Sequence, residues 1–208
     1  MPSSITIIDY GMGNLGSIRN MLKLIGVDAV ISSDAATIER SDKLILPGVG
    51  AFDKGMENLK SLGLIDVLSK KIILAKTPIL GICLGMQLFT KTSEEGKLAG
   101  LGWIDARTVK FRFDRDAKNI KIPHMGWNEV MPAKESLLFK DARENLRFYF
   151  LHSYYVKLNN PADALTITNY GHEFVSAIEN GNIIGVQFHP EKSHKFGVRF
   201  LENFVKFY

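Results

Sequence analysis

The stretch from residue 79 to 87, Ile-Leu-Gly-Ile-Cys-Leu-Gly-Met-Gln, joins a short apolar run typical of a buried strand to a helical pattern. A sharp turn at Cys83 would force an unfavourable backbone conformation there, and Gly81 and Gly85 would relieve the crowding on either side. The cysteine side chain would then project above the edge of the sheet, and the N–H groups of a helix beginning near Leu84 would favour its thiolate. The alternative is an inert core cysteine, but the flanking glycines favour a nucleophile.

Two further apolar runs, at residues 5–8 and 43–46, also precede turns and helical patterns. The helical patterns cover residues 15–25 and 52–68, the second with an interruption at Gly63. Repetition of strand, turn and helix predicts an α/β fold with a mostly parallel central sheet flanked by helices on both faces. Ligands bind beyond the carboxyl ends of the strands in such sheets, and the cysteine lies at one of these ends.

The second half of the chain, from about Trp103, is richer in strands and turns. A last helix is predicted from the apolar spacing between Phe196 and Phe207. No linker, repeat or low-complexity segment marks a boundary, so we expect one domain over residues 1–208. The strand-like segments are residues 107–113, 147–151, 164–168 and 183–188.

The composition is that of a soluble globular protein, with 46% hydrophobic and 23% charged residues among 208. The N-terminus lacks the pattern of a secretory signal, and no apolar run is long enough to span a membrane. Cys83 is the single cysteine, which excludes a disulfide within the chain and fits a reducing compartment. We therefore expect a cytoplasmic protein without a membrane segment.

The net charge of +4 is a mild excess, and nucleic-acid binding would need a concentrated basic face. Asp105, Asp114 and Asp116 dilute the best candidate, and no aromatic stacking motif accompanies it. We expect no nucleic-acid partner. The basic cluster consists of Arg107, Lys110, Arg112, Arg115, Lys118 and Lys121.

A thiolate nucleophile needs a base and a group that orients the base. The sequence Phe-His-Pro-Glu-Lys-Ser at 188–193 offers His189 and Glu191, which a turn at a strand end can bring together. The carboxylate would then fix the tautomer of the imidazole and stabilise its protonated form. A structural histidine beside a surface Glu-Lys pair is the alternative, and this pair alone is a weak signal. We expect no metal, because zinc-motif spacing is absent among His124, His152, His172 and His194.

A third feature is the turn Pro-Gly-Val-Gly at 47–50, again at the end of an apolar strand. Glycines there let backbone N–H groups face an anion, as an oxyanion hole requires. The rival interpretation is a phosphate-binding turn. Neither this turn nor Tyr-Gly-Met-Gly-Asn at 10–14 has the remaining residues of a nucleotide fingerprint, so we expect no cofactor.

Together, and in this order along the chain, these motifs resemble those of class I (triad) glutamine amidotransferases. Finer motifs resemble the HisH-type glutaminase subunits of imidazole glycerol phosphate synthase. The resemblance runs from the first strand to the final helix and implies the same α/β fold. The finer motifs are Asp-Tyr-Gly-Met-Gly-Asn at 9–14, Pro-His-Met-Gly-Trp-Asn at 123–128, His-Ser-Tyr-Tyr at 152–155 and His-Pro-Glu-Lys-Ser at 189–193.

The resemblance implies that a Cys-His-Glu triad hydrolyses glutamine to glutamate. Cys83 would attack the side-chain amide, and His189, oriented by Glu191, would protonate the departing ammonia and then activate water against the thioester. The oxyanion would be held by the N–H of Leu84 and by one N–H of the Val49-Gly50 turn.

The resemblance also implies how the amino-acid head group of glutamine is bound. Glu95 is suited to the α-ammonium group, although Glu94 could replace it after a small register shift. The backbone near residues 153 and 154 would meet the α-carboxylate. The residues implied in head-group binding are Gln87, Glu95, Ser153 and Tyr154.

Ammonia released into neutral water is mostly ammonium, so its delivery to an acceptor implies a partner docked over the active site. The resemblance implies a heterodimer with a HisF-type (β/α)8-barrel synthase, with Asn14 and Lys192 near the interface. It also implies low activity until the partner binds its ligand. Lys192 has an ordinary alternative as a surface lysine.

The acceptor of the ammonia stays open. The favoured interpretation is formation of imidazole glycerol phosphate and AICAR in histidine biosynthesis, whereas paralogues supply ammonia to enzymes that make amidino sugars for surface polysaccharides. A catalytically silent scaffold is less favoured because all three triad residues are present. A stand-alone cysteine hydrolase is less favoured because Gln87 and Glu95 indicate glutamine.

Overall fold

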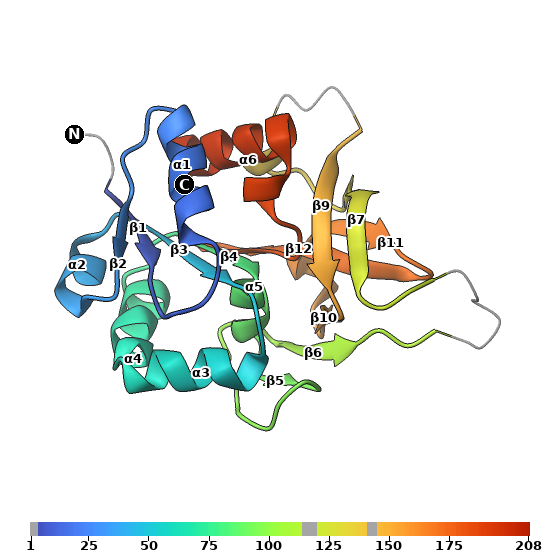
Figure 1. The fold of residues 1–208 in the computed structure, drawn as a ribbon, viewed down its shortest axis with the longest axis horizontal. Helices are drawn as coiled ribbons and strands as arrows, with labels where there is room; N and C mark the ends of the chain where they lie inside the picture. The colour runs from blue at the N-terminus through green and yellow to red at the C-terminus, as the bar shows by residue number, and fades with distance from the viewer. Residues whose placement is uncertain (1–3, 114–119, 141–144) are drawn as a thin grey trace.

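The computed structural model describes residues 4–113, 120–140 and 145–208. A large mixed sheet forms its centre, with helices on both faces (Figure 1). The α-helices are α1 (Leu15–Leu24), α2 (Ala35–Arg40), α3 (Phe52–Ser61), α4 (Leu64–Ser69), α5 (Leu84–Leu88) and α6 (His194–Phe207). Shorter helical turns are η1 (Lys70–Leu74), η2 (Leu137–Phe139), η3 (Pro161–Asp163) and η4 (Pro190–Lys192).

The half of the sheet that contains the cysteine is parallel, as the sequence predicts. Its neighbouring strands, in spatial order, are β2, β1, β3, β4 and β13. Their bounds are β1 (Ile5–Ile8), β2 (Val30–Ser32), β3 (Lys43–Gly48), β4 (Ile79–Cys83) and β13 (Ile183–Val186).

The sheet continues beyond β13 with antiparallel pairings to β12, β10 and β6, while β5 runs parallel to β6. Apart from β5, the strands of this part of the sheet come from the strand-rich second half of the chain. These strands are β5 (Thr92–Ser93), β6 (Ala106–Lys110), β8 (Met131–Pro132), β10 (Tyr154–Leu158), β11 (Ala164–Asn169) and β12 (Glu173–Asn180). A separate antiparallel pair consists of β7 (His124–Glu129) and β9 (Arg147–His152).

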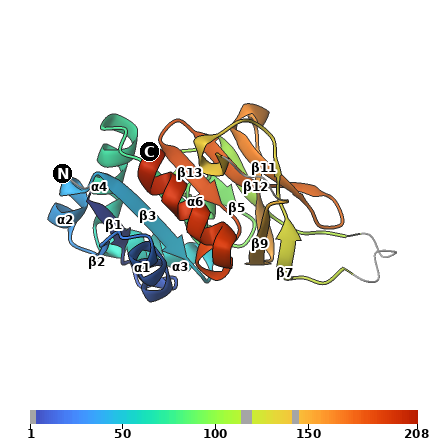
Figure 2. The ribbon, with the colours of Figure 1, turned by 90° about the horizontal axis from the view of Figure 1, so that it is seen from above.

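Alternate residues of the parallel strands enter two different cores. Ile7, Ile45 and Leu80 pack with residues of α1 and α6. Leu44 and Ile79 belong to the core beneath α2 to α5 on the opposite face. α1 and α6 lie together over one face, and α3 and α4 lie over the other (Figures 1 and 2). Burial of both faces explains why the strands are continuous apolar runs.

The helical pattern at 52–68 forms two helices, because the chain breaks at Gly63. This glycine has φ +66°, a left-handed conformation that ends α3 and starts α4. The strand predicted at 107–113 is shorter in the structure and spans Ala106–Lys110. The last helix begins at His194, just before the first apolar residue of its pattern.

Within the described ranges, no helix is long and apolar enough to cross a membrane. No group of three histidine, cysteine or acidic residues in that part of the chain is placed to hold a metal ion. Of the predicted basic cluster, Arg115 and Lys118 lie outside the described residues, as do Asp114 and Asp116 beside them.

Candidate active site

Cys83 is the last residue of β4 and directly precedes α5. Its backbone has φ +54° and ψ −107°, so the strained corner predicted from the sequence is present. A Cβ at Gly81 would lie 2.5 Å from the ring of Phe89, and one at Gly85 would lie 1.8 Å from the carbonyl oxygen of Leu46. The two glycines therefore allow the corner to pack against its neighbours. The sequence predicts that N–H groups at the start of α5 face the sulfur, but Cys83 makes no side-chain capping hydrogen bond to this helix, which has only five residues.

His189 is placed by the neighbouring strand. β13 runs parallel to β4, with Val186 opposite Ile82, so the two strands end side by side and deliver His189 to the edge that holds the cysteine. The N–H of His189 donates to the carbonyl oxygen of Tyr149 at 2.9 Å. The hydroxyl of Ser193 donates to the carbonyl oxygen of His189 at 2.6 Å and accepts the N–H of Tyr149 at 3.0 Å. These bonds fix the backbone of the histidine.

The imidazole of His189 has two different surroundings. Its Nδ1 lies 2.8 Å from Oε1 of Glu191, and both side chains are almost completely buried. Its Nε2 has no hydrogen-bond partner among the described residues. Burial lowers the pKa of His189, but the nearby Cys83 sulfur and the Glu191 carboxylate outweigh this effect and raise the pKa to about 10. The site therefore favours a protonated histidine beside the cysteine.

The predicted oxyanion turn lies directly beside the nucleophile. β3 runs parallel to β4, and its last residue, Gly48, is opposite Cys83. A Cβ at Gly48 would lie 2.7 Å from the Cβ of Leu84, so the end of β3 packs on the start of α5. Val49 and Gly50 follow at the surface, and Gly50 has φ +126°. The structure thus brings the turn, Leu84 and Cys83 together.

The residues predicted to bind the head group of glutamine gather next to this turn. Nε2 of Gln87 donates to the carbonyl oxygen of Tyr154 at 3.2 Å. The carboxylate of Glu95 accepts the N–H of Phe52, the first residue of α3, at 2.9 Å. Burial and the negative charges of the neighbouring glutamates raise the pKa of Tyr154. Ser153 links β9 to β10 beside Tyr154.

The structure separates the two candidates for the α-ammonium group. The carboxylate of Glu94 accepts the N–H of Lys110 at 2.9 Å and pairs with Arg112 at 2.8 Å. The hydrogen bond from Lys110, with the help of Arg112, lowers the pKa of Glu94. Glu94 therefore belongs to the surface beside β6, and Glu95 is the glutamate that lies beside the turn.

Gln187 was not among the predicted site residues; it directly follows β13, and its side chain is fully buried. Its Nε2 donates to Sγ of Cys83 at 3.6 Å, and its Oε1 accepts Nε2 of Gln87 at 3.0 Å. The signal available in the sequence was a single amide between the apolar run 183–186 and Phe188. A polar residue at that point of a buried strand needs a buried partner.

A chain of hydrogen bonds through two buried histidines was also missed. Asn128 Nδ2 lies 3.3 Å from Nε2 of His124, and His124 Nδ1 lies 3.0 Å from Nε2 of His152. His152 Nδ1 donates to the carbonyl oxygen of Tyr154 at 2.7 Å. Burial lowers the pKa of His124 to about 4 and that of His152 to about 3, so both rings are neutral at pH 7. They support the carbonyl that also holds Gln87.

The two residues predicted near a partner interface lie on the surface. The side chain of Asn14 caps α1 by accepting the N–H of Ser17 at 3.3 Å. Nζ of Lys192 lies 5.7 Å from the ring centre of Tyr149. Trp127, on β7, stacks on His194 with ring centres 5.5 Å apart and remains 39% exposed.

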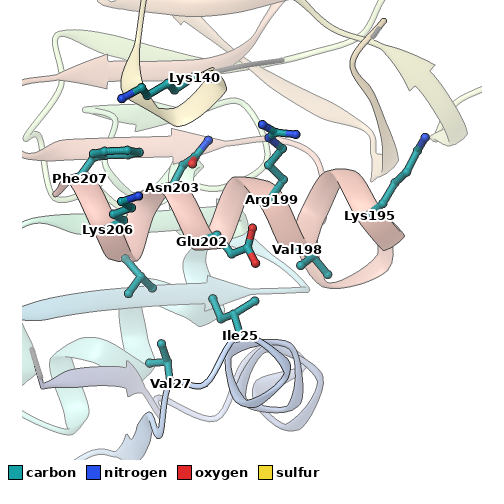
Figure 3. Close-up of a pocket in the computed structure, with 11 residues that line it drawn as sticks. Ile25, Val27, Lys140, Lys195, Val198, Arg199, Glu202, Asn203, Lys206 and Phe207 are labelled. Carbon is teal, nitrogen blue, oxygen red and sulfur yellow. The ribbon is translucent and has the colours of Figure 1, made fainter. Parts of the chain in front are cut away.

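A hollow with a volume of about 810 Å³ lies between α6, the loop after α1 and the end of η2 (Figure 3). Its lining includes Lys140, Arg199 and Lys206, with Glu202 among them. None of the residues predicted for the triad, the oxyanion turn or the head group lines it. This hollow is therefore separate from the candidate active site.

A cysteine at a strained strand–helix corner, with a buried His-Glu pair on the next strand and a glycine turn opposite, is the arrangement of a cysteine-dependent amide hydrolase. The chain belongs to the family of class I glutamine amidotransferases, whose model matches residues 6–207. It is therefore a glutamine amidotransferase built on the α/β fold described above.

Among curated relatives, the chain is similar to "Imidazole glycerol phosphate synthase subunit HisH 2" of Methanococcus maripaludis, with 58% identity over 97% of this chain and 98% of the relative. The protein of the same name from Pseudomonas aeruginosa is 48% identical over the same shares. The HisH subunit of Leptospira borgpetersenii is 48% identical over 97% of this chain and 98% of its own.

Solved structures show the same fold at low sequence identity. The PurLQS structure from Thermotoga maritima matches with a TM-score of 0.75 and 16% identity, over 100% of this chain and 99% of the other. A glutamine amidotransferase from the same organism matches with a TM-score of 0.66 and 20% identity, over 97% of this chain and 82% of the other.

Proposed function

We propose that this chain is the glutaminase subunit of an imidazole glycerol phosphate synthase and acts in histidine biosynthesis. The observation that carries the proposal is the buried His189–Glu191 pair at the strand end next to Cys83. The names of relatives up to 58% identical over nearly the whole chain support the choice of pathway. The whole chain, residues 1–208, acts as one amidotransferase domain in the cytoplasm, without a metal or cofactor.

The reaction follows from the positions of the triad. The Cys83 thiolate attacks the side-chain amide carbon of glutamine and forms a tetrahedral intermediate. Nε2 of His189, whose other nitrogen is held by Glu191, gives its proton to the amide nitrogen, so that ammonia leaves and a thioester forms. The neutral imidazole then takes a proton from water, which attacks the thioester and releases glutamate and the thiolate.

The substrate is oriented by the residues that lie around the turn. The N–H groups of Leu84 and of the Val49-Gly50 turn stabilise the oxyanion: Leu84 directly follows Cys83, and the turn follows Gly48, which lies opposite Cys83. Glu95 binds the α-ammonium group, and Gln87 with the backbone at 153 and 154 meets the rest of the head group. Gln87 lies on α5 and bonds to the carbonyl oxygen of Tyr154, while Glu95 accepts the N–H of Phe52 next to the turn.

The ammonia passes to a (β/α)8-barrel synthase partner that covers this edge of the sheet in a heterodimer. Asn14 and Lys192 contact that partner in the proposal. Val49, which follows Gly48 opposite Cys83, has an exposed apolar side chain, and this supports docking of a partner at that edge.

The test is a glutaminase assay of the purified chain, alone and with the barrel partner and its nucleotide ligand. We expect slow hydrolysis alone and clear acceleration in the complex, and a loss of about 10³-fold or more in Cys83→Ser. Ser61→Ala, on the surface at the end of α3, is the control and retains activity. Near wild-type turnover by Cys83→Ser would remove this cysteine from the mechanism, and full activity of the isolated chain would contradict the coupling.

The acceptor of the ammonia is tested separately. The gene should restore growth without histidine to a strain that lacks its own HisH-type glutaminase, and a Cys83→Ser copy should fail to do so. A well-expressed active glutaminase that does not complement would overturn the assignment to histidine biosynthesis in favour of another acceptor, such as a sugar amidotransferase.

A further inference from the structure

We propose that Gln187 is a positioning residue of the glutaminase, which directs an N–H at the nucleophile and couples it to the residues that bind the head group. This role rests on the proposed function, in which Cys83 attacks glutamine and Gln87 contacts it. Neither the motifs of the sequence nor the triad assigns a role to Gln187.

The direction of each amide in this cluster follows from one carbonyl group. The carbonyl oxygen of Tyr154 can only accept, and it receives Nδ1–H of His152 at 2.7 Å and Nε2–H of Gln87 at 3.2 Å. The same nitrogen of Gln87 faces Gln187 at 3.0 Å, so the group of Gln187 that meets it must be the oxygen. The nitrogen of Gln187 is then the atom that faces Sγ of Cys83 at 3.6 Å.

The surroundings make this chain of bonds rigid. Gln187 is fully buried and Gln87 is 5% exposed, so water does not compete for their amides. The N–H of Gln187 also donates to the carbonyl oxygen of Ser176 at 2.9 Å, which fixes its backbone. Gln187 is therefore held at its backbone by Ser176 and at its side-chain oxygen by Gln87.

The N–H of the Gln187 side chain has two consequences for the nucleophile. A hydrogen bond to a charged acceptor is stronger than one to a neutral acceptor, so the donor favours the thiolate over the thiol. It also fixes the direction of a side chain that is attached to a strained backbone. The Cys83 thiol donates to the Leu151 carbonyl at 3.9 Å, but this bond needs the thiol hydrogen and therefore does not favour the thiolate.

The chain of bonds connects two parts of the reaction. Gln87 holds the oxygen of Gln187, and Gln187 holds the sulfur. A change at Gln87 therefore reaches the nucleophile even when no glutamine is present. A residue that contributes only packing would not transmit a change at Gln87 to the reactivity of Cys83, whereas a positioning residue would.

The experiment uses the full chain, in which Cys83 is the single cysteine, so that thiolate absorbance and alkylation report this residue alone. Gln187→Met removes both bonds at similar volume. We expect its alkylation by iodoacetamide, without glutamine and at about pH 6, to be about tenfold slower, because the thiolate population falls by more than its nucleophilicity rises. Its thiolate absorbance should fall in parallel.

Gln187→Glu is the second variant and retains an acceptor for Gln87. As a carboxylate it has no hydrogen to donate to the sulfur, so we expect slow alkylation and a lowered kcat with a KM close to that of the wild type. Gln187→Met should change KM as well, since it releases Gln87. Gln87→Met should slow alkylation severalfold without substrate. The double variant with Gln87→Met and Gln187→Met should be alkylated at nearly the same rate as Gln187→Met alone.

Ser176→Ala is the matched control, since Ser176 is equally buried on the next strand but does not bond to the amide cluster through its side chain. Its alkylation should equal that of the wild type. Wild-type alkylation rates in both Gln187 variants, or slowing in Ser176→Ala to the same extent, would overturn the inference. Because alkylation is measured without glutamine, a failed glutaminase assay would refute the proposed function and leave this test valid.

Discussion

At the scale of single residues, Tyr10 is unusual because its hydroxyl is buried without a hydrogen-bond partner in the part of the chain that is described. Burial, together with the charge of Cys83, raises the pKa of this phenol, so the hydroxyl stays neutral. The ring fills the space beside Gly48, where a Cβ would lie 2.5 Å from the hydroxyl oxygen. Tyr10 therefore contributes packing at the base of the oxyanion turn while its hydroxyl is unsatisfied.

Tyr10→Phe should therefore raise the free energy of unfolding by about 1 kcal/mol, because it removes a buried group whose desolvation no bond offsets. Urea unfolding followed by circular dichroism measures this. Tyr170→Phe is the matched control, since the Tyr170 hydroxyl donates to the carbonyl oxygen of Lys121 at 2.8 Å and its loss should cost about 1 kcal/mol. Equal destabilisation of both variants would mean that the Tyr10 hydroxyl has a partner in solution.

Single residues also show how far the site could be predicted. The placement of Cys83, His189 and Glu191 at one edge of the sheet could be predicted, because each lies in a short motif with its own chemical logic. Gln187 could not, because its role depends on Gln87, which lies 100 positions away and meets it only in the folded sheet. The same holds for the contact between His124 and His152, which joins two strands.

At the scale of elements, the break between α3 and α4 depends on the backbone of one glycine. Gly63 has φ +66°, and no atom lies within 4 Å of the position that its Cβ would occupy. A side chain there would meet no steric conflict with its surroundings, so only the left-handed backbone conformation opposes it.

Gly63→Ala should lower the free energy of unfolding by about 1 kcal/mol through this conformational cost. Gly16→Ala is the contrasting control, because Gly16 lies within α1, has an equally open Cβ position and has no positive φ. That change should raise stability by about 0.5 kcal/mol or more. Thermal and urea unfolding of both variants would measure the difference, and destabilisation by both would contradict this explanation.

The strands and helices themselves were largely predictable, but the order of the strands within the sheet was not. The apolar runs at 5–8, 43–46 and 79–82 all form strands, because a sheet covered on both faces requires them. The run at 183–188 gives no sign that it lies between β4 and β12. Any buried strand has the same apolar composition, so its place in the sheet is decided by packing over the whole chain.

At the scale of the whole molecule, the buried histidines make stability depend on pH. Burial lowers the pKa of His124 to about 4 and of His152 to about 3. Both rings are therefore neutral in the folded chain at pH 5, whereas they bind protons in the unfolded chain below about pH 6.5. Because the unfolded state binds more protons in this window, stability falls as the pH falls.

Between about pH 6 and pH 5, the free energy of unfolding should fall by up to about 2.7 kcal/mol per pH unit from these two groups. His189 has a raised pKa and is largely protonated in both states there, so it adds little slope. Urea unfolding at a series of pH values gives the slope, and His124→Gln should reduce it to about half. A wild-type slope near zero in this range would contradict the burial of neutral histidines.

The position of β13 has a consequence for how the protein matures. This strand lies between β4 and β12 in the sheet, although its residues, 183–186, come after both of them in the chain. Until it is synthesised, the two halves of the sheet have no strand to join them, and Cys83 has neither His189 nor Gln187 beside it. On the ribosome, the thiol of a growing chain therefore lacks both neighbouring side chains until residue 189 has been added. If the proposed triad is correct, a chain interrupted before that point does not hydrolyse glutamine.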